Sequence, residues 1–386
     1  MDIVKIRDET PASLKLAHFN NAGSSLNPTP VTDAVLRHLR REQEIGGYEA
    51  AAEAAPLVKQ FYLAMAELLS CQPGEIAFIE NATRAWELAL YSIPLNAGDE
   101  IITFPSEYAS NYMGLTHLAR QKQLSVKVAP LDHQGLVDLQ ALTSMISDRT
   151  RLIALTHIAS QRGDIQPATQ IGKIAREYEL FYLLDGCQSA GQLHLNVYDI
   201  GCDFLAGTGR KYLRGPRGTG FLYVNQARFA ELDPVFVDLH SASWEAQEQF
   251  QWQPDARRFE NFERHLAGMI GLGIAADYAN QLGTKNIESR ILDLTNTLRE
   301  KLTNTSGITL HERSGNNSGI VTFSKEDEEA AALHKRLQQA GINTSVAKRE
   351  NARFDLDRED LSAVLRASIH YYNTEDEIAR LLELLQ

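Results

Sequence analysis

Between positions 75 and 206 the sequence alternates short apolar runs with amphipathic stretches, and this alternation constrains the fold more than any other feature. Strands separated by helices join as parallel neighbours through crossover connections, so the order predicts an α/β fold with helices on both faces of a mostly parallel sheet. The apolar runs of strand length are 75–79, 100–103, 125–129, 151–156 and 180–184. Stretches with helical periodicity are 28–45, 50–69, 82–91, 108–122, 138–146 and 167–178.

The pattern changes near position 203. Short apolar runs at 203–206 and 220–224 are separated by a turn of glycine, proline and arginine at 215–218, which predicts a hairpin-like insertion. Long helical patterns follow at 259–281 and 285–302. The rest of the chain mixes both kinds of element and predicts a smaller α+β lobe. Its expected strands are 319–323 and 365–369, and its expected helices are 328–339 and 375–385.

Composition narrows the possible partners. The chain carries a formal charge of -12 and has a pI near 5.4, so nucleic acids and anionic membrane surfaces would repel it. We therefore expect a small-molecule substrate and no nucleic-acid or membrane partner. Residues 1–9 are charged where a signal peptide needs an apolar core, and no run reaches the roughly 18 apolar residues of a membrane span. An odd number of cysteines without metal-ligand spacing favours a reducing cytoplasm and no metal site. These cysteines are Cys71, Cys187 and Cys202.

An acid and an amine stand at two positions where a cofactor would need them. Asp185 ends the 180–184 strand, and Lys211 follows in a loop of small residues. Pyridoxal phosphate (PLP) chemistry requires this pair of groups. The amine holds the cofactor's aldehyde as a Schiff base, and the acid keeps the ring nitrogen protonated so that the ring accepts electrons. The pair predicts a PLP site, whereas a surface lysine and an acid that merely ends a strand are the alternative interpretation.

The phosphate of such a cofactor is expected where a helix begins. Free backbone N–H groups and the positive end of the helix dipole favour a dianion there. Asn81 is a candidate helix cap between a strand and a helix, so the backbone of Ala82 and Thr83, with the Thr83 hydroxyl, is the predicted phosphate site. The same cap sequence also starts helices that bind nothing.

Together with segments 19–23 and 365–374, these motifs resemble the class V aminotransferase family of fold-type I PLP enzymes, in order and spacing over nearly the whole chain. The nearest branch resembles the cysteine desulfurases and selenocysteine lyases. The resemblance implies a large PLP-binding domain with a sheet of the seven-stranded type between helices, and a small α+β domain built from both chain ends. It also implies a homodimer with active sites at the subunit interface. We expect residues 1–25 to belong to the small domain, 26–270 to form the large domain and 271–386 to complete the small one.

The resemblance assigns roles residue by residue. Lys211 matches the Schiff-base lysine that also shuttles the substrate's Cα proton, and Asp185 matches the partner of the ring nitrogen. Gln188 matches a residue that hydrogen-bonds the cofactor's phenolic oxygen, with an exposed polar residue as the alternative. Thr208 and Arg210 match positions that reach the phosphate. Desulfurases carry histidine where this chain has Arg210, and arginine is the stronger, permanently charged phosphate partner.

Other positions depart further from the family pattern or concern the substrate. Tyr108 falls where desulfurases place a histidine stacked on the cofactor; tyrosine keeps the aromatic surface but is a poor acid or base near neutral pH. It could equally be a core aromatic. Arg366 matches the arginine that binds the substrate's α-carboxylate, unless it is only solvated. Ser160 falls where an asparagine often contacts substrate or cofactor. Glu263 replaces a threonine that reaches the phosphate from the second subunit.

The expected reaction follows from a missing residue. Desulfurases carry a mobile cysteine that leaves as a persulfide, but the corresponding stretch, 342–354, contains none. Its Arg349 and Arg353 either reach an anionic substrate or are solvated. We therefore expect a PLP-dependent C–S lyase that performs β-elimination on cystine, a cysteine conjugate or a cysteine sulfoxide.

Two alternatives stay open at this point. A class V aminotransferase or an amino-acid epimerase would use the same groups but return the proton elsewhere. A non-catalytic sulfur-carrier scaffold is a hypothesis of another class, and the retained Lys211, Asp185 and Arg366 argue against it.

Overall fold

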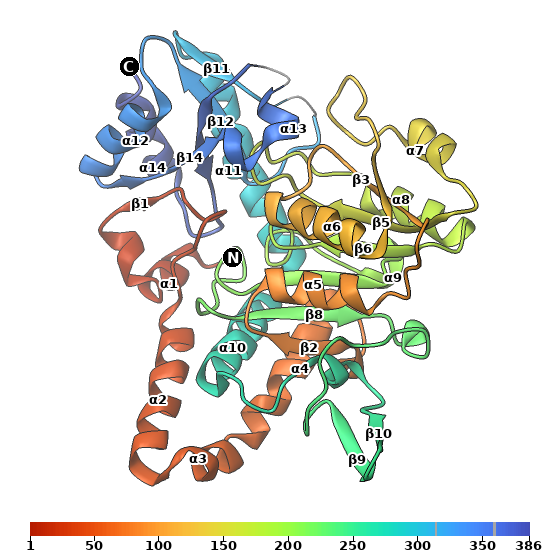
Figure 1. Cartoon of the computed structure of the whole chain (residues 1–386). Helices are drawn as coiled ribbons and strands as arrows, with labels where there is room; N and C mark the ends of the chain where they lie inside the picture. Colours follow the sequence, from red (N-terminus) through yellow and green to blue (C-terminus); the bar gives the residue numbers. More distant parts are fainter. Residues whose placement is uncertain (313–314, 358–359) are drawn as a thin grey trace.

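The computed structural model describes residues 1–312, 315–357 and 360–386. Its centre is a seven-stranded sheet in the order β2-β8-β7-β6-β5-β3-β4 (Figure 1). Neighbouring strands from β4 to β7 run parallel, and only β8 is antiparallel to both of its neighbours. The predicted α/β fold and mostly parallel sheet are confirmed. The strands are β2 (Ile76–Ile79), β3 (Glu100–Thr103), β4 (Ser125–Val128), β5 (Thr150–Thr156), β6 (Phe181–Asp185), β7 (Phe204–Thr208) and β8 (Gly220–Val224).

Helices cover both faces of the sheet, and alternate strand residues explain why. Leu152 and Leu183 belong to the core on one face, whereas Ile153 and Leu184 belong to the core on the other. Because successive side chains of a strand point to opposite faces, a central strand between two helical layers is apolar throughout. The first face is covered by α5 (Ala82–Ser92) and α6 (Ala109–Lys122). The second is covered by α4 (Ala55–Leu69), α8 (Ala168–Glu177) and α10 (Leu266–Leu282).

Two expected helices differ in the structure, and a hairpin that was not expected lies before the second one. The helix expected over 50–69 is two helices, α3 (Gly47–Glu53) and α4, that break at Ala54. Pro56 causes the break, because proline has no N–H and clashes with a preceding helical turn. The helix expected from 259 begins at Leu266, after a 3₁₀ turn at Ala256–Phe259. A hairpin of β9 (Ala242–Ala246) and β10 (Gln249–Trp252) precedes it, and its mostly exposed residues gave no clear alternation.

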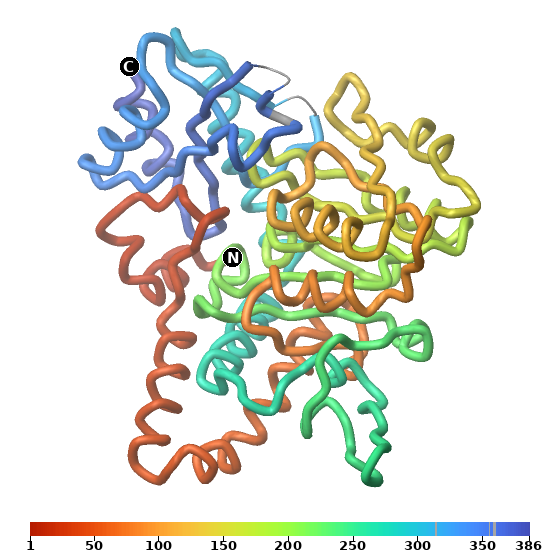
Figure 2. The backbone as a smooth tube through the Cα atoms, viewed as in Figure 1, coloured from red at the N-terminus to blue at the C-terminus, as the bar shows by residue number. Residues whose placement is uncertain are grey.

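The two ends of the chain meet in a second layered unit. An antiparallel sheet of order β11-β12-β15-β14 packs with helices around a separate apolar core. β1 (Ala17–His18) pairs in parallel with β13 (Ile342–Asn343), and Figure 2 shows the N-terminal segment beside the C-terminal one. The strands are β11 (Ile308–Leu310), β12 (Ile320–Lys325), β14 (Ser345–Lys348) and β15 (Ala363–Ser368). The remaining helices are α1 (Ile3–Asp8), α2 (Thr29–Ile45), α7 (Leu139–Met145), α9 (Val197–Ile200), α11 (Thr284–Thr303), α12 (Ala330–Gln339), α13 (Arg353–Leu356) and α14 (Glu375–Glu383).

The expected division at 25 and 270 stays a prediction. Position 270 falls inside α10, and α11 contributes to two cores: Ile287 and Ile291 pack with the large sheet, whereas Leu294 and Leu298 pack with the small one. These contacts favour a change of unit within α11. Across the described ranges, no helix combines the length and apolar character needed to cross a membrane.

Candidate active site

A cavity opens where β5, β6 and β7 end, beside the start of α5. The carboxyl ends of parallel strands meet at one edge of a sheet, and ligands bind there in open α/β folds. This edge brings together eight predicted site residues from five separate segments of the chain. Its lining consists of Asn81, Ala82, Thr83, Tyr108, Thr156, Ile158, Ser160, Asp185, Cys187, Gln188, Arg210 and Lys211.

The start of α5 presents unused backbone donors to the cavity. Asn81 caps the helix, and its side-chain oxygen accepts a hydrogen bond from the Arg84 amide at 3.0 Å. The first amides of a helix have no partner within the helix. The amides of Ala82 and Thr83 make no hydrogen bond within the described ranges. Such amides are the donors that the predicted phosphate site requires, and that assignment stays a prediction.

The end of β6 supplies a carboxylate and an amide. Asp185 is only 6% exposed, and its two oxygens accept hydrogen bonds at 2.8 Å from the Asn111 side chain and from the Cys187 amide. Gln188 is buried rather than exposed. Its Nε2 donates to the Ala22 carbonyl at 3.1 Å, and its Oε1 is a buried acceptor without a partner among the described residues. A ligand in the cavity with a hydroxyl group would satisfy that oxygen.

The loop after β7 supplies a buried amine. Lys211 is 9% exposed, and its Nζ makes no hydrogen bond or ion pair in the part of the chain that the structure describes. Burial lowers the pKa of Lys211, and the negative charge of Asp185 opposes this shift. Beside it, Arg210 donates to the Thr208 hydroxyl at 2.9 Å. Thr208 itself does not line the cavity, and its hydroxyl also donates to the Thr219 carbonyl.

Arg366, on β15, approaches the same region from the small sheet. Its Nε donates to the Ser345 hydroxyl at 3.0 Å, and one terminal nitrogen donates to the Ser160 carbonyl at 2.8 Å. Burial lowers the pKa of the guanidinium. Arg366 is therefore not an ordinary solvated arginine. The carbonyl that it contacts belongs to a residue that lines the cavity.

Tyr108 lines the cavity at the start of α6. Its side chain is 39% exposed, so it is not a core aromatic. Its amide donates to Glu107 at 3.0 Å and to the Thr156 hydroxyl at 3.1 Å.

Three polar residues at this edge escaped the sequence analysis. Thr156 ends β5 and lines the cavity, whereas Asn111 donates to both Asp185 and Glu107, and Glu107 also accepts from Thr156. A position at the carboxyl end of a predicted parallel strand was the available signal for Thr156. The four-residue spacing of Glu107 and Asn111 at a helix start was the signal for the other two.

The cysteines and the two loop arginines have other surroundings. Cys187 lines the cavity, but burial raises the pKa of its thiol well above the usual value, which keeps it protonated. Arg349 pairs with Asp357 and Asp360 on its own loop, so it is a paired surface charge. Arg353 is exposed at the start of α13.

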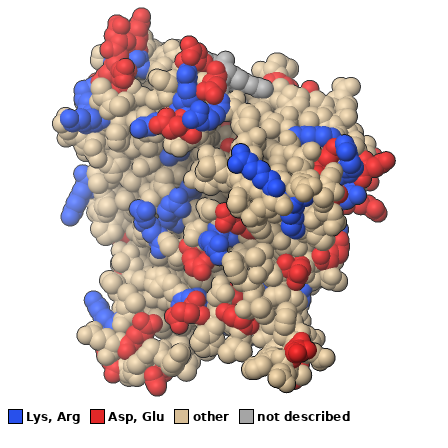
Figure 3. Space-filling view, in the orientation of Figure 1, with Lys and Arg blue, Asp and Glu red and all other residues tan. Residues whose placement is uncertain are grey.

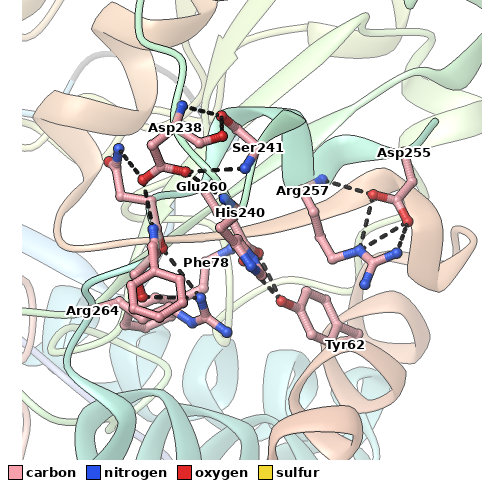
Figure 4. A network of polar contacts seen from close by, with 11 residues as sticks. Tyr62, Phe78, Asp238, His240, Ser241, Asp255, Arg257, Glu260 and Arg264 are labelled. Carbon is pink, nitrogen blue, oxygen red and sulfur yellow. Dashed lines mark hydrogen bonds and ion pairs between the residues drawn. The ribbon is translucent and has the colours of Figure 1, made fainter. Parts of the chain in front are cut away.

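A second polar cluster centres on Glu260, whose side chain is completely buried (Figure 4). Its carboxylate accepts hydrogen bonds from the Tyr62 hydroxyl at 2.9 Å and from the Phe78 amide at 2.8 Å, and it contacts His240 Nε2 at 2.8 Å. None of these residues lines the cavity. The cluster ties β2 to α4 and to the loop before β9.

Comparison with known sequences defines the class of protein. A profile of the family described as Aminotransferase class-V matches residues 17–381, so the chain belongs to that family, as its motifs predicted. A probable cysteine desulfurase of Methanothermobacter thermautotrophicus is 28% identical, and the match covers 99% of this chain and 96% of the relative. A probable cysteine desulfurase of Halalkalibacterium halodurans is also 28% identical, with 99% and 95% covered.

Solved structures agree on the fold. The apo cysteine desulfurase of Thermococcus onnurineus NA1 superposes with a TM-score of 0.92 at 23% identity, covering 99% of this chain and 96% of that one. A complex of the cystine C–S lyase C-DES with its reaction product cysteine persulfide gives a TM-score of 0.88 at 24% identity, with 97% and 98% covered. The fold expected from the sequence is thus shared with these proteins.

Proposed function

We propose that this protein is a PLP-dependent lyase that cleaves the carbon–sulfur bond of a cysteine-type amino acid by β-elimination. One observation carries the proposal: among the described residues the buried Lys211 amine has no hydrogen-bond partner, and it shares a cavity with the Asp185 carboxylate and with the amides that begin α5, which are unbonded in the same ranges. Membership of the class V aminotransferase family supports PLP as the cofactor. The names of the relatives and of the C–S lyase support a sulfur-bearing substrate.

The residues present fit the cofactor's separate groups. The amides of Ala82 and Thr83 would bind the phosphate dianion, with the Arg210 guanidinium as a counter-charge. Asp185 is the acid for the ring nitrogen. The Gln188 oxygen, which has no partner in the described ranges, would accept a hydrogen bond from the ring hydroxyl. The Tyr108 ring supplies an aromatic surface.

When bound, the cofactor would supply an aldehyde for the amine and a ring that accepts electrons from the substrate's Cα. Lys211 has a lowered pKa, so more of it is the neutral amine near neutral pH than for an exposed lysine, and this amine takes the Cα proton. Arg366 is held by Ser160 and Ser345 so that its guanidinium can bind the α-carboxylate.

β-Elimination, rather than transfer of sulfur to a cysteine, is proposed because a sulfur-accepting cysteine is missing. The stretch 342–354 contains no cysteine to accept sulfur, and the buried Cys187 thiol is held protonated. Loss of the Cα proton and of the Cβ–S bond releases a thiol or, from cystine, cysteine persulfide. The carbon product is 2-aminoacrylate, which hydrolyses to pyruvate and ammonia. No oxidant or reductant is needed, because the electron pair of the Cα–H bond forms the new double bond.

The test is pyruvate release from cystine by purified protein, with and without added PLP. We expect PLP-dependent pyruvate and persulfide from wild type and neither product from Lys211→Ala. Exchange of the amino group with a keto acid, or loss of optical activity without pyruvate, would instead establish the aminotransferase or epimerase. If the wild-type protein binds no PLP, the non-catalytic scaffold would be the remaining hypothesis.

We also propose that the protein is a homodimer. Exposed large apolar side chains gather between residues 235 and 262, and Trp244 and Phe250 face each other across β9 and β10. Figure 3 shows few charged side chains at the lower right, where β9 and β10 lie in Figure 1. A patch of this kind marks an interaction surface. The exposed residues are Val235, Phe236, Val237, Leu239, Trp244, Phe250 and Phe262. Light scattering of wild type and Leu239→Glu tests the dimer: the variant is expected to be monomeric.

A cytoplasmic location is part of the same proposal. The three cysteines are unpaired, and two of them are buried. Such thiols suit a reducing compartment.

A further inference from the structure

A single buried amide joins two carboxylates behind the cavity wall. The Asn111 Nδ2 donates to Glu107 Oε1 at 2.9 Å and to Asp185 Oδ2 at 2.8 Å. All three side chains are buried, with exposures of 3%, 5% and 6% for Asn111, Glu107 and Asp185. A primary amide nitrogen carries two hydrogens, so both of its donors are used, one on each carboxylate. The amide therefore cannot rotate without leaving a buried carboxylate oxygen without its donor.

Glu107 is itself held from several elements. Besides Asn111 on α6, its carboxylate accepts hydrogen bonds from Thr103 Oγ1 at 3.2 Å, Thr156 Oγ1 at 2.5 Å and the Tyr108 amide at 3.0 Å. Thr103 ends β3 and Thr156 ends β5. The carboxylate thus anchors the ends of two strands to the start of α6. Four donors around one carboxylate favour its ionised form.

Burial and Asp185 act in the opposite direction on Glu107. Burial, followed by the nearby Asp185 charge, raises the pKa of Glu107 to about 7 even though its donors lower it. Asp185 lines the cavity together with the cations Lys211 and Arg210, and the charges of Asp185, Arg210 and Arg366 all act on Lys211. Glu107 is therefore poised to change charge near neutral pH.

The position of the pair relative to the cavity defines its role. Asp185 lines the cavity, but Glu107 and Asn111 do not. Neither residue therefore touches a bound ligand directly. Asn111 reaches the cavity through Asp185, and Glu107 contacts the lining residues Thr156 and Tyr108. They are positioning residues, and their effect has two components: the direction of the Asp185 carboxylate and the total negative charge behind it.

We propose that Glu107 and Asn111 position Asp185 against the cofactor's ring nitrogen, and that the Glu107 charge strengthens the retention of the proton on that nitrogen. The inference rests on the proposed PLP function and deepens it. A second anion a few ångströms behind the first stabilises the protonated ring by Coulomb attraction. Ionised Glu107 therefore raises the proton affinity of the ring nitrogen, and neutral Glu107 lowers it.

The first test follows the bound cofactor by its absorbance and fluorescence as a function of pH. Glu107→Gln keeps the shape and removes the charge, so the transition assigned to the ring nitrogen is expected to move down by about one pH unit. Asn111→Ala removes both donors to the carboxylates and is expected to move it in the same direction. Glu260→Gln changes another buried glutamate that does not touch the cavity, and its spectrum is expected to titrate as wild type.

The second test uses the apoprotein and needs no cofactor. Because the folded pKa of Glu107 lies above that of an unfolded glutamate, about 4.3, the folded state binds more protons between these values. Stability is consequently lost as pH rises through this window. Urea denaturation at several pH values measures the free energy of unfolding. The difference between Glu107→Gln and wild type should favour the variant more at pH 8 than at pH 5.

The outcomes separate the two proposals. A cofactor spectrum in wild type whose pH transition is unchanged in both Glu107→Gln and Asn111→Ala overturns the positioning role alone. The shift in the two variants, without a shift in Glu260→Gln, supports it. Absence of any cofactor band in wild type overturns the PLP function and this role together.

Discussion

Two buried cations lie three residues apart on the loop between β7 and β8, and their surroundings are opposite. Arg214 is 1% exposed and donates to the Leu26 carbonyl at 2.8 Å, the Tyr371 hydroxyl at 2.9 Å and the Thr10 hydroxyl at 2.6 Å. Its guanidinium also lies 4.6 Å from the centre of the Tyr372 ring. Lys211 is almost as buried, but within the described ranges it has no such partner.

The difference separates structure from chemistry. A buried charge is tolerated when hydrogen bonds replace its lost water, as they do for Arg214. Arg214 binds the loop to the N-terminal segment through Thr10 and Leu26. It also binds the loop to the segment that follows β15, through Tyr371. No described residue gives the Lys211 amine such compensation, so burial lowers its pKa and leaves it available to react. Arg366 is intermediate, with two acceptors and one terminal nitrogen without a hydrogen bond in the described part of the structure.

The largest expected effect is on activity. Lys211→Ala should lower pyruvate release by about 10⁴-fold, because both the amine for the aldehyde and the base for Cα are lost. Circular dichroism should remain that of wild type, since the amine makes no hydrogen bond to any residue that the structure describes. Borohydride reduction with PLP, followed by peptide mapping, should label position 211 in wild type. Labelling at another position, or a loss of pyruvate release of less than tenfold, would contradict the assignment of Lys211 as the reactive member of the pair.

The next effect is on stability. Arg214→Met should lower the free energy of unfolding by about 3 kcal/mol, because the Leu26 carbonyl and two hydroxyls lose a buried donor. Urea denaturation measures it. Arg217→Met on the same loop is the matched control, because Arg217 is exposed and its loss is expected to cost less than about 0.5 kcal/mol. Equal effects of both substitutions would mean that Arg214 is not the structural member of the pair.

A smaller effect tests the intermediate cation. Arg366→Lys keeps the charge but loses the planar fork that meets a carboxylate, so KM should rise by about 30-fold, or about 2 kcal/mol. kcat should change much less, because the α-carboxylate is bound equally in the ground and transition states. A fall in kcat at unchanged KM would place Arg366 in the chemistry rather than in binding.

The meeting of Asp185 and Lys211 could be predicted from the sequence, because it depends on local patterns of strands and turns. Asp185 and Lys211 each follow an apolar strand, so their meeting at one sheet edge follows from parallel strand order alone. The same reasoning predicted the α5 start at Asn81 and the turn between β7 and β8. The roles of these residues stay predictions until the variants are measured.

The sequence did not reveal contacts that depend on distant partners. Arg214 satisfies its donors with residues about 150 to 200 positions away, and no local pattern indicates such a set. The Asn111 bridge similarly joins α6 to β6 across 74 positions. The hairpin of β9 and β10 was missed because its exposed residues lack the alternation that a buried face imposes.

The smallest expected effect returns to Lys211 and concerns the apoprotein. Burial lowers the pKa of Lys211, so the folded state favours the neutral amine. Below that folded pKa both states are protonated, and the folded protein bears the full cost of the buried charge. As pH rises toward about 10.4, the value of an unfolded lysine, the folded state releases its proton first and stability increases.

Lys211→Met removes this cost while preserving the apolar stem. The variant should therefore be more stable than wild type by about 1 kcal/mol at pH 7, as expected for a group that is kept for activity at the expense of stability. The advantage should shrink as pH approaches the unfolded pKa. Denaturation of both apoproteins from pH 7 to pH 10 measures it, and Lys59→Met, on the exposed side of α4, controls for the loss of a positive charge. A difference independent of pH would show that the Lys211 amine bears no titratable cost, and the contrast with Arg214 would then rest on hydrogen-bond partners alone.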